Sequence, residues 1–388
     1  MIRWIPWLAI ACILTTGLFP GLLHPSPPVP VPYCTDTGAF VPTSALAGSE
    51  TLLVPKPLGE KDAADIACLE IELDRLRQRL SIPAFSAAIV HDQEILWARG
   101  FGCADIETGE PATPHTPYHL ASLTKPFGAT VLLQLVEEGL VGLDDPVSEY
   151  GVSLESHGVV RVKHLLSHTS GGTPGRRYRY CGDCFGLIDQ VMLHATGTSF
   201  RSLLIERILT PLGLGDTLPS PSNAAEFDRY ELGTAEEPFQ GIWNRMARPY
   251  VLYEGAIYEW RYVTYFGSAA GLISSVVDYA AFDAALDQHM FLSPETQELA
   301  WTPYESNSGR ALAYGYGWFV QHRKGLRYLW HYGYWDCTST LIVKVPERGL
   351  TFLLFANSDR LSSPFRLGAD EDVRRSPAAR IFLDLFVE

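Results

Sequence analysis

Short strand-like runs occur near both ends of this chain, and a long, mainly helical stretch separates them. At the start, "AFSAAIVHDQEILWARGFGCAD" holds two apolar runs around a polar turn, which is typical of a β-hairpin. Near the end stand four short runs divided by Gly, Pro or charged residues: "GYGWFVQH", "LRYLWHYGY", "TSTLIVKVP" and "LTFLLFAN". We therefore expect an α/β (α+β) fold, in which both ends build one antiparallel sheet flanked by helices, with an inserted mainly helical lobe.

Two helices are predicted in the N-terminal half of the chain. Residues 62–80, "DAADIACLEIELDRLRQRL", place apolar residues at helical spacing with charges between them, which predicts an amphipathic helix. Residues 124–140, "TKPFGATVLLQLVEEGL", predict a buried helix. Proline lacks an N–H group and is tolerated only in the first turn of a helix, so Pro126 places this helix start near Ser122.

The composition excludes several classes of function. The 47% hydrophobic residues allow a large core, which argues against global disorder. A formal net charge of −14 argues against nucleic-acid binding, since contact with phosphates needs clustered Lys and Arg. No His, Asp or Glu cluster has metal-ligand spacing, and we expect no metal and no cofactor.

The N-terminus predicts export. Arg3 precedes "WIPWLAIACILTTGLFPGLL", which carries no charge and is long enough to span a bilayer. We interpret residues 1–24 as a signal peptide or membrane anchor, with Cys12 as a lipidated cysteine the lesser alternative. The prolines of residues 25–59 favour a semi-rigid linker, and residues 60–388 form the predicted folded domain. The expected location is periplasmic or extracellular, with possible membrane attachment through this N-terminal segment.

Ser122 and Lys125 in "ASLTKPF" have the spacing of a nucleophile and its base. Residues three apart on a helix share a face, so the amine can reach the hydroxyl. A neighbouring amine with a lowered pKa can take the proton of an otherwise poor serine nucleophile. The motif alone is common, however, and Ser122 as a helix cap with Lys125 as a solvated side chain is the competing interpretation.

The pair of cysteines in "CGDC", Cys181 and Cys184, favours a tight local disulfide in an exported chain. A zinc half-site is the weaker alternative, because no second Cys-x-x-Cys accompanies it. A redox role is also weak, because no strand–CxxC–helix pattern surrounds the motif.

The order of further motifs carries a family resemblance. After "ASLTKPF" the chain continues with "LVEEGLVGLDDPVSEY", "VKHLLSHTSGG", "ATGTSFRSLLIERILTPLGLGDT", "GSAAGLISSVVDYAAF", "YGYGW" and "HYG". Over roughly residues 80–360 this order resembles the serine β-lactamase-like superfamily, in the branch of class C β-lactamases, D-alanyl-D-alanine carboxypeptidases and family VIII esterases. The resemblance implies that Ser122 is the acylated nucleophile and Lys125 its partner.

The family's Tyr-x-Asn motif aligns with "YCG". The resemblance implies that Tyr180 shares the acid–base role with Lys125, provided that nearby positive charge lowers its pKa. Gly182 stands where the family has an asparagine, which touches the lysine and the amide of the substrate. A Cys181–Cys184 bridge is our hypothesis for what holds Tyr180 without that asparagine.

The third motif is His-x-Gly at His331 and Gly333. The resemblance implies that His331 hydrogen-bonds Tyr180 or a substrate carboxyl, and Gly333 allows close approach of the substrate. The N–H groups of Tyr334 and Ser122 would form the oxyanion hole.

Two further motifs are interpreted as structural. His168 in "LLSHTSGG" stands beside Ser167, but adjacent residues seldom face each other, and the stretch is a fold marker in the family. Asp144 and Asp145 have the pattern of turn and cap residues rather than of a catalytic carboxylate pair.

The sequence therefore predicts a serine hydrolase that acts through an acyl-enzyme on an ester, D-amino peptide or amide. The partner is a small-molecule or peptide substrate, and no protein partner is implied. A true β-lactamase is one alternative, and a catalytically weak penicillin-binding-like sensor or binding module is another.

Overall fold

The computed structural model describes residues 60–221, 239–367 and 371–388. The segments predicted as signal or anchor (1–24) and linker (25–59) lie outside the described residues. In the part that is described, no helix is both long and apolar enough to cross a membrane.

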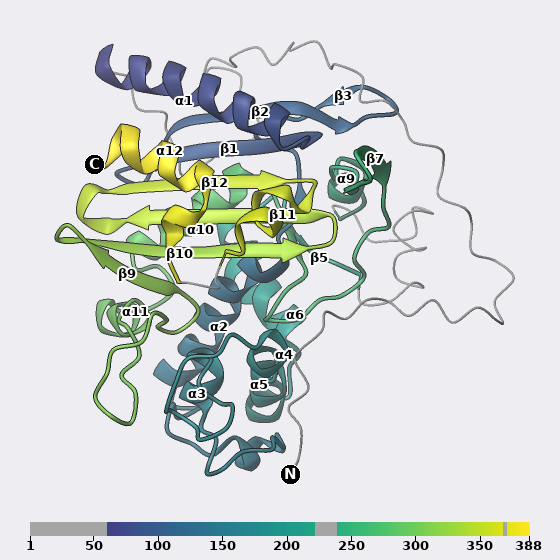
Figure 1. Ribbon diagram of the computed structural model, residues 1–388. Helices are drawn as coiled ribbons and strands as arrows, with labels where there is room; N and C mark the ends of the chain where they lie inside the picture. Colours follow the sequence, from purple (N-terminus) through teal and green to yellow (C-terminus); the bar gives the residue numbers. More distant parts are fainter. Residues whose placement is uncertain (1–59, 222–238, 368–370) are drawn as a thin grey trace, which may run out of the picture.

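A seven-stranded antiparallel sheet forms the centre of the molecule, with strand order β3-β2-β1-β12-β11-β10-β9 (Figure 1). Strand β1 pairs with β12 from Phe85 opposite Ala356 to His91 opposite Leu350, which joins the two ends of the domain. This confirms the predicted sheet. Its strands are β1 (Ala84–His91), β2 (Glu94–Asp105), β3 (Glu110–Pro111), β9 (Phe319–Arg323), β10 (Leu326–Trp335), β11 (Thr338–Val345) and β12 (Leu350–Ala356).

Helices cover both faces of this sheet, because both faces carry apolar side chains. Phe85, Ala87 and Ile89 of β1 pack in one core with helix α1 (Glu60–Arg79) and helix α12 (Pro377–Phe386). Ala84, Ala88 and Val90 alternate to the other face and share a core with α2 (Lys125–Glu137) and α10 (Val276–Asp287). The period of two residues along the strand accounts for this division.

The helical lobe lies beyond α2 on that second face (Figure 1). Its regular elements are short, and some begin with a side-chain cap, as at Ser199, which accepts from the backbone N–H of Ser202. The elements are α3 (Val162–Leu166), α4 (Gly182–Gly186), α5 (Ile188–Thr196), α6 (Phe200–Leu204), a π-helical turn (Ile205–Leu209) and α7 (Thr210–Leu212). Helices α9 (Phe239–Asn244) and α11 (Pro294–Ala300) complete the predicted helical middle.

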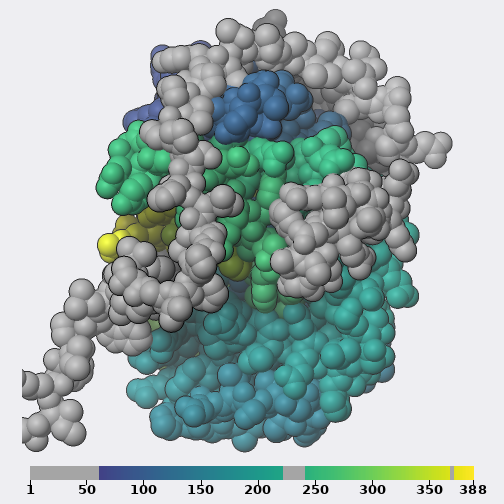
Figure 2. All heavy atoms as spheres, turned by 90° about the vertical axis from the view of Figure 1, so that its right-hand side faces the viewer, coloured from purple at the N-terminus to yellow at the C-terminus, as the bar shows by residue number. Residues whose placement is uncertain are grey.

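Two small sheets interrupt this helical region. Strands β4 (Tyr118–His119), β8 (Leu272–Ser274) and β5 (Leu218–Pro219) pair in the order β4-β8-β5. Strands β6 (Tyr250–Tyr253) and β7 (Ala256–Glu259) form a hairpin that the sequence argument did not anticipate. In Figure 2 residues near 250 (green) lie between residues near 110 (blue) and the helical lobe (teal).

A buried lysine links the sheet to the helical layer. Lys344 on β11 is 2% exposed, and its Nζ lies 3.1 Å from Oδ2 of Asp283 and 2.6 Å from Oδ2 of Asp287 on α10. The two carboxylates raise the pKa of Lys344 against the effect of its burial. Breaking such a buried pair leaves an uncompensated charge.

We predict that Lys344→Met lowers the free energy of unfolding by about 3–5 kcal/mol, because the variant leaves the buried Asp283 carboxyl without its cationic partner. Chemical denaturation at pH 7 measures this loss. The control is Arg75→Met, which removes an ion pair with Glu72 that is largely exposed and should cost less than about 1 kcal/mol. Equal losses in the two variants would contradict the structural role of Lys344.

Candidate active site

Ser122 lies on a 3-10 turn, Ala121–Thr124, which continues directly into α2. Pro126 falls in the first turn of α2, as its missing N–H group requires, so the predicted helix start is confirmed. Ala121 has a left-handed backbone with φ of 48°, a sparsely populated region for a residue with a Cβ. Strain of this kind is common where a side chain must be held for chemistry.

Hydrogen bonds from two sheets hold this turn in place. The N–H of Leu120 donates to the carbonyl of Leu272 on β8 at 2.8 Å. From β11, the Thr340 hydroxyl donates to the carbonyl of Leu120 at 2.8 Å, and the Thr338 hydroxyl donates to the carbonyl of His119 at 2.6 Å. The turn that carries Ser122 is therefore fixed between the sheet and the lobe.

Lys125 reaches Ser122 as the three-residue spacing predicts. Its Nζ donates to the Ser122 Oγ at 3.0 Å and to the carbonyl of Ala269 at 2.8 Å. The lysine is fully buried, and burial lowers the pKa of its amine to about 7, while the nearby carboxylate of Asp183 acts in the opposite direction. At neutral pH much of the amine is therefore uncharged and able to accept a proton.

Tyr180 lies beside this pair. The Lys125 Nζ lies 5.0 Å from the centre of the Tyr180 ring and 5.4 Å from the centre of the Phe185 ring. Burial raises the pKa of Tyr180 above its ordinary value, and Tyr332 adds to the increase. Proximity to the Ser122 hydroxyl lowers the pKa of Tyr180 by a smaller amount, although the two hydroxyl groups do not meet the geometry of a hydrogen bond.

The expected lowering of the Tyr180 pKa is therefore wrong. Tyr180 is partly buried, but its hydroxyl oxygen is shielded from solvent and has no hydrogen-bond partner within the described residues. A buried phenolate lacks the hydration that stabilises its charge, so Tyr180 stays protonated.

His168 supports Tyr180 rather than Ser167. Its ring centre lies 4.3 Å from that of Tyr180, and its Nδ1 accepts the backbone N–H of Cys181 at 3.2 Å. The Ser167 hydroxyl instead bonds the Lys163 carbonyl and the Thr169 hydroxyl. His168 is thus a packing and loop-holding residue, in line with its structural interpretation.

Cys181 and Cys184 form the expected disulfide. The bridge spans the first turn of α4, where Cys181 is the N-cap residue, and directly follows Tyr180. Gly182 leaves open space, since a Cβ added there would meet nothing within 4 Å. Asp183 is the charged residue of this turn, and its carboxylate is close enough to Lys125 to affect the lysine pKa.

The expectation that His331 hydrogen-bonds Tyr180 or a substrate carboxyl is wrong: the ring centres of His331 and Tyr180 lie 6.4 Å apart, but both ring nitrogens bond other groups. The residue is fully buried, its Nδ1 lies 2.8 Å from the Tyr332 carbonyl, and its Nε2 lies 2.8 Å from the Tyr314 hydroxyl. A carbonyl can only accept, so Nδ1 carries the proton and Tyr314 donates to Nε2. Burial lowers the pKa of His331 well below its ordinary value, so the ring is neutral.

Gly333 is required for a reason other than the one expected. A Cβ at this position would lie 2.1 Å from the carbonyl oxygen of Leu120 and 2.2 Å from the Thr340 hydroxyl. The close approach is thus between β10 and the backbone that leads into Ser122. Strand β9 pairs with β10 only as far as Trp330, so Tyr334, which is 48% exposed, lies beyond the edge that β9 covers.

Two groups of the site were missed by sequence reasoning. The Ala269 carbonyl, within "GSAAG", is a main-chain acceptor for Lys125, and no residue type signals such a role. Tyr314, the first tyrosine of "YGYGW", holds His331. The motif order marked both segments as typical of the family without indicating what either one contacts.

Comparison with known proteins agrees with this geometry. The Beta-lactamase family model matches residues 72–374. The chain belongs to this family. Penicillin-binding protein 4* of Bacillus subtilis (strain 168) is 26% identical over 308 residues, 69% of this chain and 66% of that protein. Esterase EstB of Burkholderia gladioli is 39% identical over 118 residues, 28% of this chain and 30% of that protein.

The chain thus spans less than two thirds of the length of these curated relatives. Among solved structures, the penicillin-binding protein homologue from Pyrococcus abyssi aligns with a TM-score of 0.67 and 24% identity. That alignment covers 78% of this chain and 75% of the other, and it confirms the predicted fold.

We predict that Lys125→Met removes a pH dependence of stability. The amine titrates near 7 in the folded chain and at the ordinary value of 10.5 when exposed, so the unfolded chain binds more protons between these values. Stability of the native chain should therefore rise from pH 7 to pH 9 by up to about 1.4 kcal/mol per unit through this group.

Urea denaturation at both pH values measures the effect. The methionine variant should lack this increment, whereas Lys324→Met, at a lysine with 60% of its side chain exposed, should retain it. The same pH dependence in wild type and in Lys125→Met would contradict the lowered pKa.

Proposed function

We propose that this chain is a serine hydrolase that acts by acyl transfer, with Ser122 as nucleophile and Lys125 as general base. The observation that carries the proposal is the 3.0 Å contact between the Lys125 Nζ and the Ser122 Oγ, made by an amine whose pKa is lowered to about 7. A base titrating near the working pH is the most effective for proton transfer.

The reaction follows from these two groups. The neutral Lys125 amine takes the Ser122 proton as Oγ bonds to the carbonyl carbon of the substrate. The tetrahedral intermediate collapses when the alkoxide or amine leaves and receives that proton. Water then attacks the acyl-enzyme, with Lys125 again accepting a proton, and Ser122 Oγ is released as the hydroxyl.

Tyr180 enters this scheme as a neutral phenol. Its raised pKa suits donation of a hydrogen bond or a proton toward the leaving group and not removal of a proton from Ser122. The unsatisfied buried hydroxyl is available for such a contact when substrate is bound.

The oxyanion is proposed to bind the N–H groups of Ser122 and Tyr334. The first N–H groups of a helix have no partner within it, and Ser122 lies in the opening turn before α2. Strand β10 approaches this turn closely at Gly333. Each donor of this kind is typically worth about 10²–10³ in rate.

The substrate class is an ester, a D-amino peptide or an amide rather than a β-lactam. Gly182 supplies no amide side chain to a substrate, and His331 is neutral and turned into the core, where it cannot pair with a carboxylate. Both differences weaken the recognition that a β-lactam would need. The alternative function, which the labelling experiment below distinguishes from a hydrolase, is a non-catalytic sensor.

We further propose that the protein is exported, with residues 1–24 as a cleaved signal or retained anchor. The uncharged segment after Arg3 and the Cys181–Cys184 disulfide support this location, because disulfides persist in oxidising compartments. Fractionation of expressing cells tests it, and recovery only in the cytoplasm would contradict it.

Active-site labelling tests the hydrolase proposal. A fluorophosphonate probe should label the wild type and fail to label Ser122→Ala, because the Ser122 Oγ lies 3.0 Å from the buried Lys125 amine that is proposed to activate it. The matched control is Ser167→Ala, which removes the other serine that invites a catalytic interpretation and should label like wild type.

A fluorescent penicillin used in parallel separates the substrate classes. Labelling by the fluorophosphonate with little penicillin adduct is the expected result. No Ser122-dependent adduct with either probe would contradict the hydrolase and favour the sensor.

A further inference from the structure

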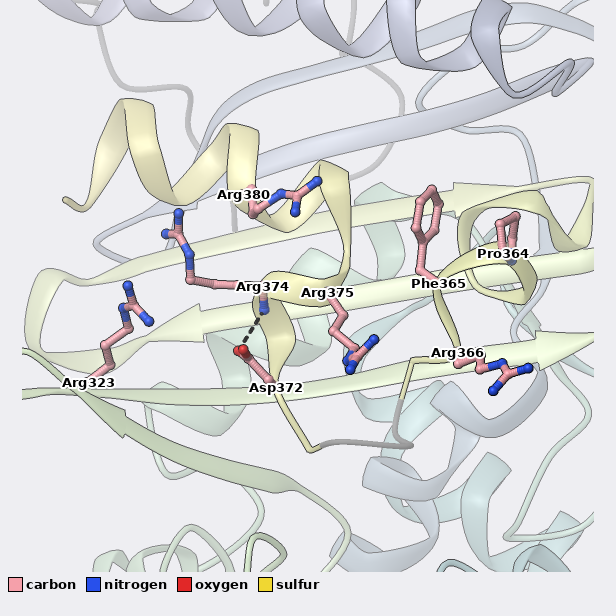
Figure 3. Close-up of a pocket in the computed structure, with 8 residues that line it drawn as sticks. All are labelled: Arg323, Pro364, Phe365, Arg366, Asp372, Arg374, Arg375 and Arg380. Atoms are coloured by element: carbon pink, nitrogen blue, oxygen red, sulfur yellow. Dashed lines mark hydrogen bonds between the residues drawn. The ribbon is translucent and has the colours of Figure 1, made fainter.

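A pocket lined mainly by arginine lies between the end of β9 and the start of α12 (Figure 3). Its volume is about 570 Å³. The arginines come from four separate segments, and no lysine is among the lining residues, which are Arg323, Pro364, Phe365, Arg366, Asp372, Arg374, Arg375 and Arg380. The lining of the pocket therefore carries positive charge, although the net charge of the whole chain is −14.

Part of this positive charge is neutralised within the protein. Arg374 pairs with Asp384 at 2.8 Å and with Glu388 at 3.0 Å, and Arg323 lies 3.4 Å from the same Glu388 carboxylate. These two guanidinium groups therefore serve mainly to fix the C-terminus against β9.

The acidic residue of the pocket is also occupied. Asp372 accepts the backbone N–H of Arg374 and the side-chain amide of Gln321, each at 3.0 Å. It therefore acts as a helix cap, although its carboxylate still reduces the local positive charge. The arginines exceed the carboxylates that face the pocket.

Arg366 and Arg380 provide positive charge that no carboxylate of the described residues neutralises. Both side chains are exposed, and neither has a hydrogen bond or ion pair with any described residue. Figure 3 shows Arg380 on α12 above the pocket and Arg366 after the Ser363–Phe365 turn below it, with Phe365 between them on one side. Two such groups on separate elements can contact one ligand from two directions.

We propose that this pocket binds an anion that carries two or more phosphate groups. The planar guanidinium fork matches phosphate oxygens in pairs, and arginine is preferred over lysine where such geometry matters. A tetrahedral phosphate offers oxygens to guanidinium groups on different sides, which a planar carboxylate does less well. The volume exceeds the need of one phosphate and suits a linear phosphate chain or a headgroup that carries more than one phosphate.

Calorimetric titration of the full chain with tripolyphosphate at fixed ionic strength tests this proposal. Wild type should bind saturably, and Arg366→Gln/Arg380→Gln should bind at least about tenfold more weakly, because charge-assisted hydrogen bonds are lost. The matched control is Arg79→Gln/Arg348→Gln, which makes the same change in net charge at exposed positions outside the pocket. It should bind like wild type.

Sedimentation with vesicles distinguishes the source of the phosphate. Binding to cardiolipin vesicles, whose headgroup carries two phosphates, that the Arg366→Gln/Arg380→Gln variant loses would identify a lipid headgroup as the ligand, and loss of tripolyphosphate binding alone would identify a free phosphate chain. Both outcomes support the pocket. Equal binding by the pocket and control variants, or no binding of either probe by wild type, would overturn it; unchanged melting temperatures verify that the variants are folded.

Discussion

The site depends on the burial of Lys125, which the fold shields from solvent. A solvated amine is protonated at neutral pH and cannot take a proton from serine, whereas the buried Lys125 has a pKa lowered to about 7. The aromatic rings of Tyr180 and Phe185 and the Ala269 carbonyl lie beside the amine, and the effect of burial on its pKa outweighs that of the nearby Asp183 carboxylate. Burial of an ionisable group disfavours its charged form, and this cost is the origin of the proposed reactivity.

The rest of the structure keeps that arrangement fixed. The turn that carries Ser122 is bonded to β8 through Leu272 and to β11 through Thr340, and β10 comes so close at Gly333 that no Cβ fits there. The loop that carries Tyr180 is closed by the adjacent disulfide and packed on His168. The sheet, built from both ends of the domain, thereby holds together groups that lie far apart in the sequence.

Much of this could be predicted from the sequence, for identifiable physical reasons. The period of two along β1 and the proline in the first turn of α2 are local signals, so the sheet and the helix start were recovered. The three-residue spacing also placed Lys125 against Ser122, as the structure confirms. The residue boundaries proposed for the three segments of the chain stay predictions.

The sequence-based predictions failed where contacts between distant segments determine the orientation or the pKa of a residue. The motif identifies His331 but does not show which way its ring points. In the folded chain the ring lies in the core, where it is hydrogen-bonded to Tyr314. The Tyr180 pKa depends on the balance between desolvation and nearby charge, and desolvation prevails. Gly333 signals a close approach, but only the folded chain shows that Leu120, and not a substrate, makes it.

The central claim, that a large fraction of Lys125 is uncharged at neutral pH, is tested most directly by NMR titration of lysine labelled with ¹³C at Cε. The Lys125 signal, assigned by its absence from Lys125→Met, should titrate with a midpoint near 7. In Asp183→Asn the midpoint should be lower, since the carboxylate that favours the ammonium is gone. A midpoint near the ordinary 10.5 would contradict the account.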